Sequence, residues 1–214
     1  MMSKKRIVIV EDHPMVREKL ADLINAELDL EVCGESDEAS HAFQLIQEKS
    51  PDLALVDLTL KNSSGLALIK KLGDLKTKIL VISMHDEANY AQRALSAGAS
   101  GYITKSKPSE EVVGAIRKVL NGEIYISEEM TSNLIRGLKS REKVSPRTVQ
   151  RLSDRELEVL EMIASGSSSR SIADSLQVGI PTVETYRNRI KNKLNLQNAF
   201  ELQNFAIRWL RERE

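Results

Sequence analysis

The sequence predicts two domains: a doubly wound α/β domain built on a five-stranded parallel sheet, and a smaller all-α domain of four helices. Three observations lead to this prediction. The first 121 residues alternate five short apolar runs with five amphipathic stretches, no strand pattern appears beyond residue 152, and 214 residues suffice for two domains of ordinary size. We expect the first domain at residues 1–121, a linker at 122–147 that contains a helix over 128–138, and the second domain at residues 148–214.

In the first domain, strands are expected where apolar residues run together without alternation, as in sheets buried on both faces. These runs lie at residues 6–11, 30–36, 52–57, 78–83 and 101–105. Apolar residues at helical spacing lie between and after them, at residues 16–26, 39–49, 66–72, 87–97 and 109–120. Strands that alternate with helices in this way form a parallel sheet, whose functional crevice lies at the carboxyl ends of the strands.

The second domain begins with a helix signal. Ser153 and Glu156 have the spacing of a capping box, and apolar residues at helical spacing continue to residue 165, where Gly166 ends the helix. Three further helices are expected at residues 169–176, 182–194 and 199–210. A short turn joins the helices at 169–176 and 182–194, an arrangement typical of a helix-turn-helix domain.

The composition argues against several classes of protein. The chain has one cysteine and three histidines, and their spacing matches neither a disulfide framework nor a Cys/His metal site. Because no apolar stretch is long enough to span a membrane and the start lacks a cleavable signal peptide, we expect a cytoplasmic protein without a membrane partner. Residues 1–121 carry 16 basic and 18 acidic side chains, and residues 151–214 carry 10 and 9. Nucleic-acid binding would therefore depend on a local patch.

Charged and polar side chains stand at the carboxyl ends of four predicted strands, namely Glu11, Asp12, Asp57, Ser83 and Lys105. Any one of them alone would be interpreted as a solvated strand end, but a parallel sheet brings all of them to one crevice. Three crowded carboxylates repel each other unless a divalent cation lies among them, and an oxygen-only ligand set favours Mg²⁺. A carboxylate nucleophile, Mg²⁺ and an ammonium group are the parts of a phosphoryl-transfer site.

Residues 4–121 resemble the receiver domain of two-component response regulators in the stretches VIVEDHPMVRE, LALVDLTLKNSSGL, VISMHDE and AGASGYITK. The resemblance implies a CheY-like, flavodoxin-like fold in which Asp57 accepts a phosphoryl group from the phosphohistidine of a histidine kinase. It also implies a Mg²⁺ site formed by Glu11, Asp12, Asp57 and the main-chain carbonyl of Thr59. Lys105 and Ser83 would contact the phosphoryl group.

The resemblance assigns Tyr102 to the position of the family's aromatic switch residue, which turns inward as Ser83 moves toward the phosphate. Packing on an edge strand explains a tyrosine at this position equally well, so both interpretations stay open. His85 and Met84 are interpreted as loop and packing residues.

The stretches LSDRELEVL, ASG, SIADSL, TVETY and IKNKL resemble the DNA-binding domain of the LuxR/FixJ class, over about residues 148–212. A receiver joined to this domain is the arrangement of NarL-type response regulators. The resemblance implies that the helix at 182–194 enters the major groove with Thr182, Glu184, Thr185 and Asn188. Four cations without an intervening acid suggest a local patch for phosphates, although a solvated helix face is the alternative: Arg187, Arg189, Lys191 and Lys193. Trp209 is expected either in the core or in a dimer seam.

The leading interpretation is a transcription factor controlled by phosphorylation, with no enzymatic activity beyond its own phosphoryl transfer and dephosphorylation. Its expected partners are a histidine kinase, an inverted repeat in double-stranded DNA, a second copy of the chain and RNA polymerase. An aspartyl phosphatase would require a second Asp as acid/base two residues after Asp57, where Thr59 stands. A receiver that dimerises independently of phosphorylation is the third interpretation.

Overall fold

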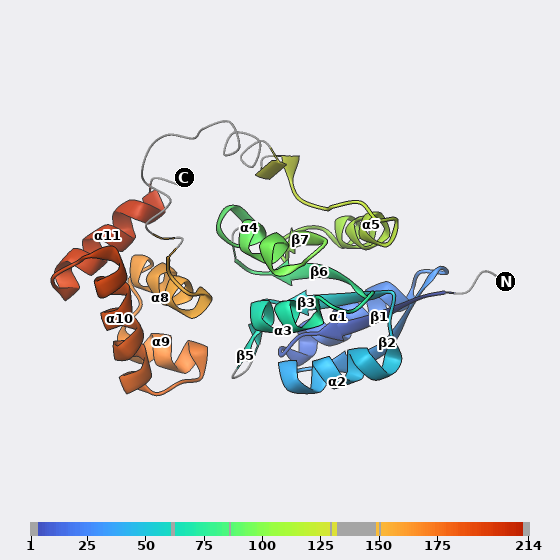
Figure 1. Ribbon diagram of the computed structural model, residues 1–214, viewed down its shortest axis with the longest axis horizontal. Helices are drawn as coiled ribbons and strands as arrows, with labels where there is room; N and C mark the ends of the chain where they lie inside the picture. Colours follow the sequence, from blue (N-terminus) through green and yellow to red (C-terminus); the bar gives the residue numbers. More distant parts are fainter. Residues whose placement is uncertain are drawn as a thin grey trace. The chain divides into compact units, whose positions relative to one another are not determined.

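The computed structural model describes residues 4–60, 63–85, 87–128, 130–131, 149 and 151–211 (Figure 1). The chain divides into two compact units, Met1–Arg141 and Glu142–Glu214. This division falls within the expected linker at residues 122–147. No helix in the described ranges is long and apolar enough to cross a membrane.

The first unit contains the predicted five-stranded parallel sheet. Its strands are β1 (Lys5–Val10), β2 (Leu30–Ser36), β3 (Leu53–Asp57), β6 (Lys78–Ser83) and β7 (Gly101–Thr104). Their order is β2-β1-β3-β6-β7, and every neighbouring pair is parallel. The central strand β3 is buried along its whole length, which explains why its apolar run shows no alternation.

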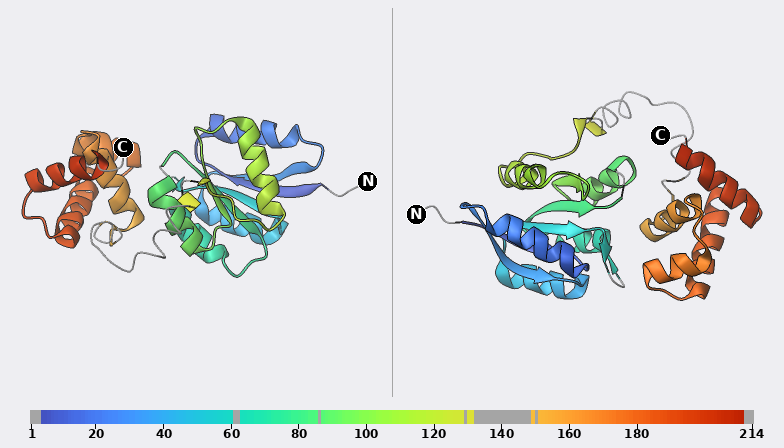
Figure 2. Two further views of the ribbon diagram at one scale, coloured as in Figure 1. Left: turned by 90° about the horizontal axis from the view of Figure 1, so that it is seen from above. Right: turned by 180° about the vertical axis from the view of Figure 1, so that it is seen from behind.

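Five helices cover the two faces of this sheet (Figure 2). They are α1 (Pro14–Asn25), α2 (Ala39–Lys49), α3 (Gly65–Leu72), α4 (Glu87–Ala97) and α5 (Ser109–Leu120). Helices α1 and α5 share one face, where Ile24 and Ile116 pack with Ile7 and Ile9 of β1. Helix α3 contacts both α2 and α4 on the other face. Helix α1 begins two residues before its predicted start, because Pro14 fits the first turn of a helix.

Two features of the first unit are absent from the sequence prediction. A short antiparallel hairpin of β4 (Thr59–Leu60) and β5 (Ser63–Ser64) lies between β3 and α3. The segment after α5 also pairs with the edge strand β7. The Tyr102 N–H donates to the Tyr125 carbonyl at 2.7 Å, and the Tyr125 N–H donates to the Ser100 carbonyl at 3.1 Å. A Cβ on Gly101 would lie 2.9 Å from the Tyr125 carbonyl oxygen, so this approach requires glycine.

Only the first turn of the helix expected at residues 128–138 falls within the described residues, and there Glu128, Met130 and Thr131 are helical. The rest of that expected helix lies outside them.

The second unit contains the four predicted helices, α8 (Asp154–Ala164), α9 (Ser169–Leu176), α10 (Ile180–Leu194) and α11 (Ala199–Arg211). The predicted capping box is present: the Ser153 N–H donates to Glu156 Oε2 at 2.6 Å, and the Glu156 N–H donates to Ser153 Oγ. The core is built from the helical apolar positions of all four elements, including Leu160, Ile172, Ile190 and Leu202. Helix α10 begins two residues before its predicted start because it accommodates Pro181 in its first turn.

Candidate phosphoacceptor site and nucleic-acid interface

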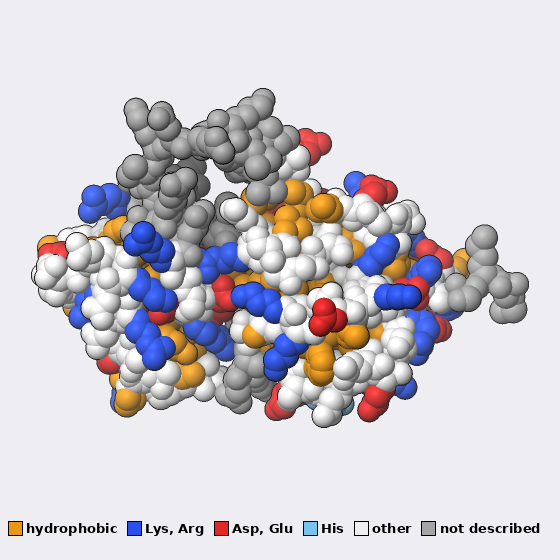
Figure 3. Space-filling model, in the orientation of Figure 1, with side chains coloured by type: hydrophobic (Ala, Val, Ile, Leu, Met, Phe, Trp, Pro, Cys, Tyr) orange, Lys and Arg blue, Asp and Glu red, His pale blue; other side chains and the backbone are white. Residues whose placement is uncertain are grey.

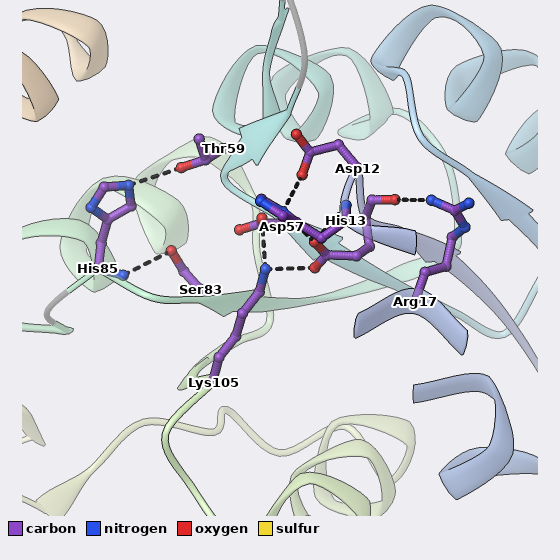
Figure 4. A network of polar contacts seen from close by, with 9 residues as sticks. Asp12, His13, Arg17, Asp57, Thr59, Ser83, His85 and Lys105 are labelled. Atoms are coloured by element: carbon purple, nitrogen blue, oxygen red, sulfur yellow. Dashed lines mark hydrogen bonds and ion pairs between the residues drawn. The ribbon is translucent and has the colours of Figure 1, made fainter. Parts of the chain in front are cut away.

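The predicted acidic cluster lies at the carboxyl edge of the sheet (Figure 4). Glu11 and Asp12 directly follow β1, Asp57 is the last residue of β3, and Lys105 directly follows β7. The start of α3 lies directly against Asp57, where a Cβ on Gly65 would overlap the Asp57 carbonyl oxygen. The parallel topology therefore brings together side chains that are up to 94 positions apart in the sequence, as Glu11 and Lys105 are.

Lys105 bridges two buried carboxylates. Its Nζ atom lies 2.8 Å from Asp57 Oδ2 and 2.6 Å from Glu11 Oε2. Glu11 is fully buried and Asp57 is 2% exposed. Two carboxylates that are buried from solvent need a compensating cation, and one ammonium group neutralises only part of their charge.

The remaining charge points to a metal. Ligand atoms of Glu11, Asp12, His13 and Asp57 all lie within 4.8 Å of one another. Three buried oxygens lack a hydrogen bond: Glu11 Oε2, Asp12 Oδ1 and Asp57 Oδ1. The first two still contact Lys105 and His13, whereas Asp57 Oδ1 has no such ion-pair contact to a described residue. A set of buried carboxylate oxygens with unused lone pairs fits a hard divalent cation.

His13 belongs to this cluster, although the spacing of the histidines in the sequence matches no metal-site motif. Its Nδ1 atom lies 2.8 Å from Asp12 Oδ1 and 3.2 Å from Glu11 Oε1, while the ring stays 66% exposed. The sequence feature that indicates this contact is the position of His13, directly after Glu11 and Asp12 and directly before α1. Spacing between histidines does not reveal this contact, because the partners of His13 are carboxylates.

The ionisation of Asp57 and Lys105 is coupled. Burial raises the pKa of Asp57 from 3.8 to about 6; the Lys105 ammonium opposes this rise and the Glu11 carboxylate adds to it. Burial acts to lower the pKa of Lys105, but Asp57 and Glu11 outweigh it, so this pKa is raised. Lys105 therefore stays cationic at neutral pH, and a divalent cation beside Asp57 would favour its carboxylate further.

Ser83, Thr59 and Tyr102 are connected through His85. Ser83 Oγ accepts a hydrogen bond from the His85 N–H at 3.2 Å, and the His85 ring Nε2 lies 2.9 Å from Thr59 Oγ1. The Tyr102 hydroxyl donates to the His85 carbonyl at 2.8 Å, and Tyr102 is 1% exposed. The His85 ring also stacks on Tyr90, with 4.5 Å between the centroids. His85 is thus the polar centre of this loop rather than only a packing residue, and Tyr102 points inward; its role as a switch stays a prediction.

The second candidate site is the solvent-facing side of α10. Thr182, Glu184, Thr185 and Asn188 are all exposed there. Arg187, Arg189, Lys191 and Lys193 do not lie side by side on this helix, because each residue advances by about 100°. Their role as phosphate contacts stays a prediction. Arg187 and Lys191 lie half-buried at one border of this side, and Arg189 and Lys193 lie exposed at the other. On the face shown in Figure 3, basic and acidic side chains are interspersed on both units.

Two of these cations are paired with acids, one with Glu156 of α8 and one with Glu184 of α10 itself. Lys193 Nζ lies 2.6 Å from Glu156 Oε2, and Glu156 is 2% exposed. Burial would raise the pKa of Glu156, but hydrogen bonds from Lys193 and Ser153 lower it overall. Arg187 Nε lies 3.9 Å from Glu184 Oε1. The other two cations of α10, Arg189 and Lys191, form no ion pair with a residue that the structure describes.

Trp209 is half-buried on α11, so the core and the dimer seam both stay open as its location.

This fold and this acidic site define a receiver domain, followed by a helix-turn-helix domain. Residues 7–117 match the family described as response regulator receiver domain, and residues 150–206 match the bacterial regulatory proteins of the luxR family. The chain belongs to the response regulators with a LuxR-type DNA-binding domain. It is a two-component transcription regulator, as predicted from the sequence.

Individual relatives cover nearly the whole chain. The oxygen regulatory protein NreC of Staphylococcus epidermidis is 34% identical over 211 residues, which are 95% of this chain and 97% of that protein. NreC of Staphylococcus aureus is 35% identical over 210 residues, with the same coverage. A LuxR-family response regulator from Aurantimonas sp. SI85-9A1 is 34% identical with a TM-score of 0.60, over 64% of this chain and all of that one. The response regulator ChrA of a heme-sensing two-component system is 25% identical with a TM-score of 0.53, over 98% and 99%.

Proposed function

We propose that Asp57 accepts a phosphoryl group from the phosphohistidine of a histidine kinase. One observation carries this proposal: Asp57 is buried beside Lys105 and two further carboxylates, with an oxygen that lacks a hydrogen bond. In the reaction an Asp57 oxygen forms a bond to phosphorus as the bond from phosphorus to the histidine nitrogen breaks, and that nitrogen keeps the electron pair. Lys105 neutralises the phosphoryl oxygens.

Glu11, Asp12, Asp57 and the Thr59 carbonyl are the groups that would hold Mg²⁺, which supplies charge neutralisation between the carboxylates and the incoming phosphoryl group. Ser83 Oγ already accepts a hydrogen bond from the His85 N–H, so its own hydroxyl proton is available to a phosphoryl oxygen. The same groups serve dephosphorylation, in which a water oxygen forms a bond to phosphorus as the bond from phosphorus to the Asp57 oxygen breaks, which restores the carboxylate and releases inorganic phosphate. A separate phosphatase activity finds no support, because Thr59 carries no carboxyl group and its hydroxyl is bonded to His85.

Phosphorylation then favours a homodimer that binds an inverted repeat through two copies of α10 and regulates transcription together with RNA polymerase, with residues 122–147 as the linker. The support is electrostatic. One C-terminal domain is nearly neutral, and the four cations of α10 are divided between the two borders of its solvent-facing side. A single copy therefore contacts few phosphates. Binding two half-sites from one dimer converts the second contact into an intramolecular one.

The input is set by the kinase rather than by this architecture. Relatives that share the architecture are named for oxygen regulation in one case and for heme sensing in another.

Mass spectrometry after treatment with acetyl phosphate and Mg²⁺ tests the phosphoacceptor. We expect one added phosphoryl group in the wild type and in Asp52→Asn, and none in Asp57→Asn. Asp52 is a matched control because it precedes the same strand at its opposite end. A label that persists in Asp57→Asn would overturn the assignment.

Calorimetric titration tests the metal site. Asp12→Ala should bind Mg²⁺ at least tenfold more weakly than the wild type, with an unchanged circular dichroism spectrum. Equal affinity would show that the metal is bound elsewhere.

A further inference from the structure

Glu184 is an acid on the side of α10 that would face DNA, where phosphates repel negative charge. Its side chain is 53% exposed, so burial does not explain its presence. Either another group compensates its charge, or the carboxylate itself contacts a base.

One carboxylate oxygen of Glu184 is held by side chains of both α9 and α10. Ser169 Oγ, in the first turn of α9, donates a hydrogen bond to Glu184 Oε1 at 2.7 Å. Arg187 Nη1 donates to the same Ser169 Oγ at 3.4 Å, and Arg187 Nε lies 3.9 Å from Glu184 Oε1. The Arg187 side chain is only 20% exposed. These contacts connect the two helices of the helix-turn-helix and leave Oε2 without a hydrogen bond to a described residue.

Glu184 Oε2 can only accept hydrogen bonds, and this property favours one base. A carboxylate only accepts hydrogen bonds, and the donors in the major groove are the amino groups of cytosine and adenine. In adenine the amino group stands beside the acceptor N7, which repels a carboxylate, whereas the amino group of cytosine has no acceptor on its own ring in the groove. A fixed Oε2 therefore favours cytosine.

We propose that Ser169 and Arg187 are positioning residues that hold Glu184 as the acceptor for a cytosine amino group in each half-site. This inference rests on the proposed DNA binding by α10. Arg187 neutralises Glu184 and does not contact a phosphate, so the phosphate contacts at α10 fall to Arg189 and Lys191, the cations without an ion pair to a described residue.

The experiment uses the full chain, treated with acetyl phosphate and Mg²⁺, and duplexes that the wild type selects from a random 20-base-pair library. Fluorescence anisotropy on the best duplex and its single-base variants, at two salt concentrations, gives base preference and salt dependence separately. We expect Glu184→Ala to remove a cytosine preference of about tenfold or more at one half-site position and to leave the others unchanged. Ser169→Ala and Arg187→Gln should each reduce the same preference at least threefold.

Matched variants distinguish positioning from general damage. Ser165→Ala, which removes an exposed hydroxyl bonded to the Glu161 carbonyl in the same domain, should change nothing. Arg189→Gln should lower the slope of log affinity against log salt by about one and keep the cytosine preference, whereas Arg187→Gln should keep the slope. Glu184→Gln should transfer the preference to adenine, because an amide can pair with both N6 and N7. That gain cannot come from an unfolded domain.

Two results would overturn the inference. One is an intact cytosine preference in Glu184→Ala. The other is an Arg187→Gln variant whose salt slope falls like that of Arg189→Gln while its base preference stays unchanged. In both cases the protein still binds DNA and the proposed function stands. A wild type that binds no duplex would overturn the proposed function, and this inference with it.

Discussion

Replacing Asp57 with Asn should stabilise the metal-free receiver, although it removes one partner of Lys105. The carboxylate of Asp57 is buried, and its pKa rises from 3.8 to about 6 on folding. A difference of about 2 pKa units corresponds to about 3 kcal/mol of unfolding free energy. Lys105 keeps its second contact, at 2.6 Å from Glu11, so the variant does not leave a buried ammonium alone.

The size of this stabilisation depends on pH. The folded receiver binds the Asp57 proton more tightly than the unfolded chain does. Ionisation of Asp57 therefore lowers the unfolding free energy of the wild type: the loss is absent below about pH 4, grows between about pH 4 and 6, and is complete above that range. Asp57→Asn lacks this titration. The variant should therefore be more stable than the wild type by about 3 kcal/mol at pH 7.5, and by close to nothing at pH 4.

Magnesium should remove this difference in stability. Only the wild type retains the complete set of carboxylates, and a ligand at 100 times its dissociation constant stabilises the folded state by about 2.7 kcal/mol. In saturating Mg²⁺ the difference between the two proteins should shrink to near zero.

Urea unfolding in EDTA and in Mg²⁺ measures these differences. Trp209 is the only tryptophan and lies on α11, so its fluorescence follows the second unit, while far-ultraviolet circular dichroism follows both. Asp57→Asn should shift the dichroism transition and leave that of Trp209 unchanged. Asp52→Asn should destabilise instead, because hydrogen bonds from the Arg6 main chain and Lys5 outweigh burial and lower the pKa of Asp52. Equal stability of Asp57→Asn and the wild type at pH 7.5 in EDTA, or a gain that is the same at pH 4, would refute the reasoning.

Two other changes test contacts that cannot be predicted from the sequence. Lys193→Gln should lower the stability of the second unit by about 1–3 kcal/mol, because the buried carboxylate of Glu156 loses its cation. The control Lys191→Gln should change the stability by no more than about 0.5 kcal/mol. Urea titration followed by Trp fluorescence measures both variants, and equal effects would contradict this account. Gly101→Ala should push Tyr125 off the edge of β7, so hydrogen exchange should accelerate at the amides of this pairing; unchanged protection would show that the backbone accommodates the methyl group.

Several features of this protein follow from the sequence alone because they depend on local chemistry. Apolar runs without alternation locate the strands, and the capping box at Ser153 locates the start of α8. Alternating strands and helices imply a parallel sheet, and a parallel sheet collects its carboxyl strand ends at one edge. For this reason Glu11, Asp57 and Lys105 could be predicted to meet without knowledge of any distance.

Only the tertiary structure decided which partner each polar group takes. His13 and His85 join the acidic site and its loop through directional contacts that no ligand spacing encodes. Glu156 holds Lys193 across 37 positions, and the 3.6-residue period of α10 divides four cations that look contiguous in the sequence. Hydrogen bonds and ion pairs act over about 3 Å, so they depend on side-chain positions that only the packed helices and sheet establish.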